Sequence, residues 1–244
     1  MNIEQLVNSS LESGIRPIEL KFAFVCKNGE VAAYRGETTI YSMLCGTLTE
    51  RDYADVIEFS EAGEQLFLRN VVTAALFVKK LTADGKTVDW ASVKCPTAFL
   101  LGGKGAAKLH NVLKEHGLTN LTKKLCIEIG LEAMTDYADE AKDTIIDLKS
   151  KGIKVMVTCG DKKDFPFLML PNVKADYLYV EDCGKDEVNA AVAKLVCSLG
   201  ANVVLGKATE KDILGSGGDV EYVISGSEAV AEDFADFGGN EYAQ

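Results

Sequence analysis

Chemically active side chains follow the ends of predicted strands in this sequence. Residues 153–157 form a short β-branched strand, and Thr158 and Cys159 come directly after it. Glu128 lies near the end of a second apolar strand, 125–129. In barrels built from repeated β-α units, the chemistry sits at the carboxyl ends of the strands. An enzyme should bring at least three carboxylates together at the strand ends. In this sequence the strand pattern identifies only one such carboxylate, that of Glu128.

Other motifs are explained better as structure than as chemistry. The glycine-rich segment 101–108 has neither P-loop spacing nor G-x-G-x-x-G, so it predicts a turn into a helix. His110 and His116 are six residues apart on a predicted helix, on different faces, which does not suit a metal pair. No Cys-His-Asp arrangement indicates a nucleophile. The sequence therefore predicts no catalytic residue, no metal site and no cofactor.

The elements that must position these groups alternate along the chain. Strands are predicted at 18–26, 31–34, 91–95, 125–129, 153–157, 175–180, 201–205 and 221–224. Helices are predicted at about 2–13, 67–81, 106–116, 136–151, 185–199 and 208–214. Asn28-Gly29 between the first two strands is a strong hairpin signal. Seven or eight strands, mostly separated by helices, favour an α/β fold with a single TIM-like (β/α) barrel over an open doubly wound sheet.

The composition fits one globular domain over residues 1–244. Hydrophobic residues make up 47% of the chain and charged residues 26%, which is ordinary for a soluble fold with a sizeable core. The net charge of −11 argues against nucleic acid or an anionic membrane as a partner, since both repel such a field. No Lys or Arg follows Lys211, and residues 237–244 predict a frayed acidic tail. A solvated end is the expectation for this tail, and a partner-binding role is the alternative.

The seven cysteines are scattered, without a C-x-x-C pair or metal-type spacing. Most lie in apolar runs, as Cys26, Cys126 and Cys197 do, which predicts reduced and mostly buried thiols. The N-terminus lacks the basic region and long apolar run of a signal peptide, and no stretch is long enough to span a bilayer. We therefore expect a cytoplasmic protein with no membrane partner.

Read in order, these elements resemble those of the EAL-domain family, bacterial phosphodiesterases that hydrolyse cyclic di-GMP on a modified TIM barrel. The hairpin 27–34 is similar to the segment that leads into the Glu-Ala-Leu signature, and 126–129 to the strand with a metal-binding glutamate. Residues 56–63 are similar to a helix of the family, and 175–181 and 203–210 to its late strands. The similarity spans nearly the whole chain. It rests on order and spacing, because no single motif is intact.

The family's mechanism implies two divalent cations, held by carboxylates and an Asn, that activate a water and clamp the phosphodiester. In this chain the signature glutamate corresponds to Arg35 and the metal-binding Asn to Lys94, whereas Glu128 is retained. The paired aspartates correspond to Thr158 and Cys159.

Two further positions depart from the family pattern. The strand-end lysine corresponds to Tyr179 and a later glutamate to about Gly206. One carboxylate beside two cations cannot hold two Mg²⁺ or Mn²⁺ ions, which need several oxygen ligands. We therefore expect the hydrolytic activity to be lost.

Two arrangements are open for Arg35, Lys94 and Glu128. If they converge at the barrel mouth, Glu128 pairs with a cation, and the net positive charge can hold an anion such as phosphate. Alternatively, Arg35 and Lys94 turn away and are solvated.

The resulting expectation is a catalytically inactive EAL-like protein that acts by protein contact or ligand sensing in bacterial signalling. A protein partner or a homodimer is expected, and the loss of ligands argues against cyclic di-GMP binding. The alternative is a metal-dependent cyclic di-GMP phosphodiesterase with displaced ligands.

Overall fold

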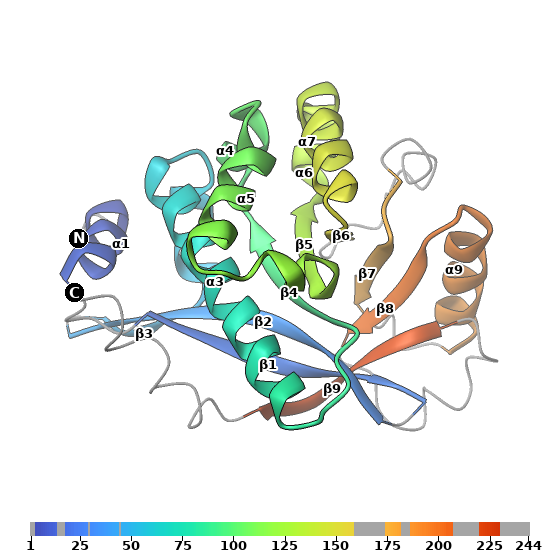
Figure 1. Ribbon diagram of the computed structural model, residues 1–244. Coiled ribbons are helices and arrows are strands. Elements are labelled where there is room, and N and C mark those ends of the chain that lie inside the picture. The colour runs from blue at the N-terminus through green and yellow to red at the C-terminus, as the bar shows by residue number, and fades with distance from the viewer. Residues whose placement is uncertain are drawn as a thin grey trace.

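The chain folds around one curled β-sheet that carries its helices on the outer face (Figure 1). A computed structural model describes residues 3–13, 18–28, 30–43, 45–158, 174–181, 186–206 and 220–229. The strands are β1 (Ile18–Lys27), β2 (Glu30–Ser42), β3 (Gly46–Leu48), β4 (Trp90–Cys95), β5 (Leu125–Gly130), β6 (Lys154–Thr158), β7 (Tyr177–Glu181), β8 (Asn202–Gly206) and β9 (Val220–Ala229). The helices are α1 (Ile3–Ser13), α2 (Glu50–Ile57), α3 (Glu61–Ala83), α4 (Thr97–Leu101), α5 (Gly105–Glu115), α6 (Leu131–Asp136), α7 (Ala138–Ser150) and α9 (Asp186–Ser198), with a 3₁₀ turn at Thr119–Lys124.

The strand order explains the curl of the sheet. From β2 the pairing runs through β4, β5, β6, β7 and β8 to β9, and every neighbouring pair in this series is parallel. The first strand, β1, is antiparallel both to β2 and to β9. This mixed α/β sheet fits the TIM-like fold expected from the alternating pattern. It departs from a uniform (β/α) repeat at its first strand, which a hairpin and not a helix joins to the second.

Side chains on the two faces of the sheet form two separate cores. The outer face packs against α3, α5, α7 and α9 through strand residues such as Val93, Ile127 and Val155. The inner face is lined by a second cluster that includes Trp90 and Cys126. Because successive strand residues alternate between faces, Ser92, Lys94 and Glu128 share the inner face with Trp90 and Cys126. The candidate residues therefore lie inside the curled sheet.

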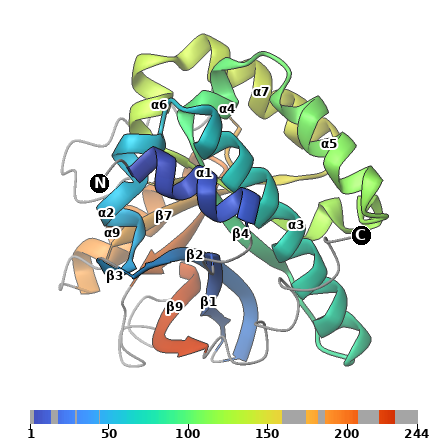
Figure 2. The same ribbon diagram turned by 90° about the vertical axis from the view of Figure 1, so that its left-hand side faces the viewer.

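Helix α1, at the start of the chain, covers the part of the β1–β2 pair in which Ile18 lies opposite Ile40. Helix α1 lies across α3 (Figure 2), and Leu6 and Val7 are buried there with Ile40 and Tyr53. Helix α2 begins where the Asp52 carboxylate accepts the backbone N–H of Thr49 at 2.7 Å. Helix α3 begins where Ser60 Oγ accepts the backbone N–H of Gly63 at 3.1 Å. These caps fix where the two helices begin, and Glu58, directly after α2, accepts the backbone N–H of Thr97 at 2.9 Å beyond the carboxyl end of β4.

Most predicted elements are confirmed, and the differences have local causes. Asn28 has a φ of 55°, as the hairpin signal requires. Strand β2 continues to Ser42 instead of ending at residue 34, because its second half still pairs with β1 (Ile18 with Ile40). The short elements β3, α4 and α6 were not predicted. The predicted helix 208–214 and the acidic tail 237–244 lie outside the described residues, and within those residues no helix is long and apolar enough to cross a membrane.

The prediction of mostly buried cysteines was wrong for the described part of the chain. Of its five described cysteines, Cys95 and Cys126 are buried, Cys26 is half-buried, and Cys45 and Cys197 are exposed. Cys197 directly follows the buried Val196 on α9. Successive residues of a helix point in different directions, so the Cys197 side chain points away from the core. The apolar run around it therefore did not imply burial.

Candidate functional site

Arg35 enters the inside of the curled sheet from β2. It pairs in register with Ser92 of the parallel strand β4, and Lys94 of β4 pairs in register with Glu128 of β5. The next residue, Gly36, lets β2 approach β4 closely, because a Cβ there would lie 2.6 Å from the Ser92 carbonyl oxygen. The register thus places Glu128 on the same inner face as Arg35 and Ser92, two residues further along the strands, where the long Arg35 side chain can reach it.

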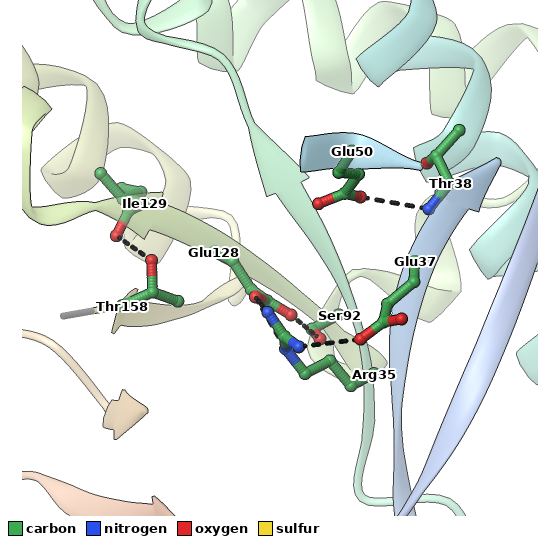
Figure 3. Close-up of polar contacts among 8 residues, drawn as sticks. All are labelled: Arg35, Glu37, Thr38, Glu50, Ser92, Glu128, Ile129 and Thr158. Atoms are coloured by element: carbon green, nitrogen blue, oxygen red, sulfur yellow. Dashed lines mark hydrogen bonds and ion pairs between the residues drawn. The ribbon is translucent and has the colours of Figure 1, made fainter. Parts of the chain in front are cut away.

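Arg35 and Glu128 form a two-pronged ion pair (Figure 3). Arg35 Nε donates to Glu128 Oε2 at 3.1 Å, and Arg35 Nη2 lies 3.0 Å from the same oxygen. The Ser92 hydroxyl donates to the other oxygen, Glu128 Oε1. The remaining guanidinium nitrogen, Arg35 Nη1, donates to Glu37 Oε1 at 3.1 Å. Of the two arrangements left open by the sequence, the structure shows one part, the pairing of Arg35 with Glu128.

Burial makes this pair costly to break. The Glu128 side chain is 0% exposed and that of Arg35 only 17%. Burial on its own opposes the charged guanidinium, but the Glu128 carboxylate and the other groups around Arg35 outweigh it, and the pKa of Arg35 is raised. Arg35 is therefore a permanent cation beside a carboxylate that is cut off from water.

Tyr179 and Gly206 close the other side of Arg35. The guanidinium carbon lies 4.5 Å from the centre of the Tyr179 ring, within cation–π range. The Tyr179 hydroxyl in turn occupies the space above Gly206, where a Cβ would lie 2.2 Å from it. Tyr179 and Gly206 are both positions at which the sequence departs from the EAL-family pattern. In the structure the large side chain at one position fills the space left by the missing side chain at the other. A side chain at position 206 would displace the ring that covers Arg35.

Lys94 does not join the ion pair. No hydrogen bond or ion pair connects Lys94 with Glu128 among the described residues, and its ammonium instead acts on Glu50, at the start of α2. Burial raises the pKa of Glu50, while Lys94 and the backbone N–H of Thr38, which donates to Glu50 Oε1 at 3.1 Å, lower it.

The charge balance differs from the expected one. The sequence suggested two cations facing one carboxylate, whereas Arg35 and Lys94 face three, those of Glu37, Glu50 and Glu128. The constellation has no net positive charge with which to attract an anion. The phosphate site expected at these residues therefore has no support from this geometry.

Comparison with known proteins identifies the fold. No protein-family model matches the sequence, and no curated protein matches it. Solved structures do match. The PaMucR phosphodiesterase in its c-di-GMP complex is similar over 93% of this chain and 97% of its own, at 15% identity and a TM-score of 0.76.

Two further structures agree. An EAL domain protein from Listeria monocytogenes EGD-e matches over 91% of this chain and 89% of its own, at 18% identity and a TM-score of 0.70. The EAL enzyme Bd1971, with cAMP and cyclic-di-GMP bound, matches over 91% of this chain at 14% identity and a TM-score of 0.76. The chain spans 64% of the Bd1971 chain. This chain has the EAL-domain fold.

The EAL resemblance implies a pair of divalent cations, and the residues present do not fit them. Arg35 sits against Glu128, the one carboxylate retained at the matching positions. Thr158 uses its hydroxyl to donate to the carbonyl of Ile129 at 3.3 Å, and Cys159 lies outside the described residues. Within the described ranges no three His, Cys, Asp or Glu side chains are placed to hold a metal ion.

Sequence reasoning missed Glu37, Glu50 and Ser92 as partners. Glu37 lies two residues after Arg35 on an extended strand, so its proximity to Arg35 could have been read from period-2 alternation. Ser92 could have been found from its place two residues before Lys94 on the same face. Glu50 carried no such signal, because a helix begins there and only the packing of α2 brings it to the strand ends.

Proposed function

We propose that this chain is a catalytically inactive EAL-fold protein of bacterial cyclic di-GMP signalling, which acts in the cytoplasm by protein contact or by ligand sensing. The observation that carries the proposal is the ion pair between Arg35 and Glu128, with two contacts of 3.0 and 3.1 Å to one carboxylate oxygen. A guanidinium in contact with this carboxylate excludes a metal ion from the same oxygen.

The energetics of cation binding support the loss of hydrolysis. Mg²⁺ and Mn²⁺ need several oxygen ligands in a nearly octahedral arrangement. Here Glu128 already accepts from Arg35 and Ser92, while the carboxylate of Glu37 also accepts from Arg35. A metal ion from solution would have to displace the Arg35 guanidinium, which the folded chain holds against Glu128. A phosphodiesterase with displaced ligands would need a second carboxylate cluster, and the described residues supply none.

The proposal includes a complete TIM-like barrel. Pairing of β1 with both β2 and β9 supports closure of the curled sheet into a ring. A closed ring holds β2, β4 and β5 at a fixed register, and the Arg35 pair depends on that register. A protein that acts by binding another protein needs a rigid surface, which a closed barrel provides, and needs no catalytic centre. The partner is expected to be another protein or a second copy of this chain.

Calorimetry with cyclic di-GMP separates the two modes of action. The full chain is titrated with cyclic di-GMP in EDTA and again in Mg²⁺ or Mn²⁺, with Glu128→Ala as the matched variant. Equal binding heat in EDTA and in metal indicates ligand sensing, and no heat in either indicates action by protein contact. Binding that requires the metal and disappears in Glu128→Ala would contradict the proposal, because it would mean that Glu128 serves as a metal ligand.

A further inference from the structure

A small pocket lies between α2, α3 and the strands β2 and β4. Its walls are mainly apolar, from residues such as Tyr53, Leu66 and Phe67. Polar side chains interrupt this lining, and Thr38, Tyr53 and Glu58 among them are hydrogen-bonded to other residues of the chain. Three more come from different elements: Glu50 from α2, Asn70 from α3 and Lys94 from β4. An open groove that Glu50 and Lys94 also line leads from this place to the surface.

Asn70 has an unsatisfied amide end in this pocket. The residue is only 4% exposed, and its Nδ2 donates to Thr38 Oγ1 at 2.8 Å. Its Oδ1 is buried and has no partner among the described residues. If the amide were turned over, Nδ2 would become the unsatisfied atom, so the conclusion does not depend on how the amide is oriented. A buried amide end without a hydrogen bond costs roughly 1–3 kcal/mol, so native proteins rarely leave one unpaired.

Glu50 and Lys94 are also incompletely bonded. Glu50 Oε1 accepts from the backbone N–H of Thr38, whereas the other carboxylate oxygen has no hydrogen bond within the described part of the chain. The Lys94 ammonium, with three donors, has no protein acceptor there either. The two charges influence each other without forming an ion pair. Space for a bridging group therefore lies between a donor and two acceptors.

We propose that this pocket holds an ordered water that joins Asn70, Glu50 and Lys94. A water that accepts from Lys94 Nζ and donates to Asn70 Oδ1 and to the second oxygen of Glu50 gives the buried Asn70 Oδ1 the partner that the described residues do not supply. Such a site needs two to four polar partners and roughly 10–15 Å³, and the pocket offers three partners and a volume of ≈ 40 Å³. A metal or ammonium ion fits less well, because the Lys94 ammonium faces the same space.

The water ties α2 to the strand ends. Without it, the one hydrogen bond between Glu50 and the sheet within the described residues is that from the N–H of Thr38. With it, three elements share one hydrogen-bonded centre, and Lys94 is held away from Glu128. This accounts for the finding that Lys94 lies on the inner face but takes no part in the Arg35 pair.

A crystal structure of the full chain at high resolution is the direct test. The expected result is an ordered water within hydrogen-bond distance of Asn70, Lys94 and Glu50. An empty pocket, or a direct ion pair between Lys94 and Glu50, would overturn the proposal. So would stabilisation by ammonium chloride beyond that given by potassium chloride, because it would identify the occupant as a cation.

A double-mutant cycle gives an independent reading in solution. Asn70→Ala and Lys94→Met each remove one partner of the water, so the double variant should lose less melting temperature than the sum of the single losses. The expected shortfall is on the order of 2–4 °C. The control cycle pairs Asn70→Ala with Lys108→Met, whose ammonium binds Glu64 at 2.6 Å elsewhere, and should be additive. Additive losses in the test cycle would refute the bridge; should Asn70→Ala not fold, the crystal structure decides alone.

Discussion

Replacing Arg35 with alanine is the sharpest perturbation of the site. The change leaves Glu128 as a carboxylate with 0% exposure and, within the described part of the chain, only the Ser92 hydroxyl as a partner. Removing one partner of a buried ion pair costs about 3–5 kcal/mol, because the remaining charge stays desolvated. The Arg35 side chain is 17% exposed, so solvent screening reduces this figure little. The loss of the contact with the Tyr179 ring acts in the same direction.

The expected loss can be measured by urea unfolding and by calorimetry. For a chain of this size about 1 kcal/mol corresponds to roughly 2–4 °C, so Arg35→Ala should lower the melting temperature by about 6–20 °C. The control is Lys21→Ala, which breaks a pair with Glu19 at 3.9 Å between side chains that are 41% and 50% exposed. That variant should lose less than about 1 kcal/mol.

A matched double variant separates charge from packing. Arg35→Met with Glu128→Leu removes both charges and keeps comparable volume, so it should recover most of the stability lost in Arg35→Ala. If Arg35→Ala were as stable as Lys21→Ala, the pair would not hold the inner face together. The account of the site as a buried charge pair would then be wrong.

Three smaller predictions follow from the same contacts. Gly206→Ala should cost about 1–3 kcal/mol in urea unfolding, because its Cβ would lie 2.2 Å from the Tyr179 hydroxyl; Gly102→Ala, whose Cβ has nothing nearer than 3.7 Å, should be neutral or slightly stabilising, and equal effects would be evidence against the fit. Burial raises the pKa of Glu50 in the folded state, so the folded protein holds this proton more tightly than the unfolded chain does. The resulting stabilisation is present below the ordinary Glu50 pKa of 4.5 and is lost as the pH rises through the raised pKa. Glu50→Gln should therefore flatten the pH dependence of the unfolding midpoint in this window, and an unchanged profile would count against it. Thiol labelling of the native protein should spare Cys126, whose pKa burial raises, until the protein unfolds; rapid labelling would contradict its burial.

The sequence was sufficient for the alternation of the parallel sheet. The strands around Glu128 and Tyr179 are short, β-branched and bounded by turns, and such patterns are local. Pairing of Arg35 with Glu128 was also accessible, since both positions follow from strand order and a shared face. What the pattern could not give was the continuation of β2 beyond residue 34. There the buried residues include Thr38 and Ser42, so polarity no longer marks the inward side.

The charge state of the site depended on that missed segment. Glu37 lies on the extension of β2, and Glu50 follows it at the start of α2. Once β2 is extended, period-2 alternation places Glu37 beside Arg35. Glu50 has no such signal, because helix–sheet packing over a long sequence separation brings it near Lys94. The anion site considered in the sequence analysis therefore combined a correct pairing of Arg35 with Glu128 and an incomplete count of carboxylates.

Hydrolysis of cyclic di-GMP by the purified full chain, with Mg²⁺ or Mn²⁺ present, tests the central claim most directly. If Arg35 holds Glu128 in place of a metal ion, no linear product forms, and neither EDTA nor Glu128→Ala changes the result. Turnover that is abolished both by a chelator and by Glu128→Ala would contradict the claim, because it would require Glu128 to leave Arg35 and bind the metal.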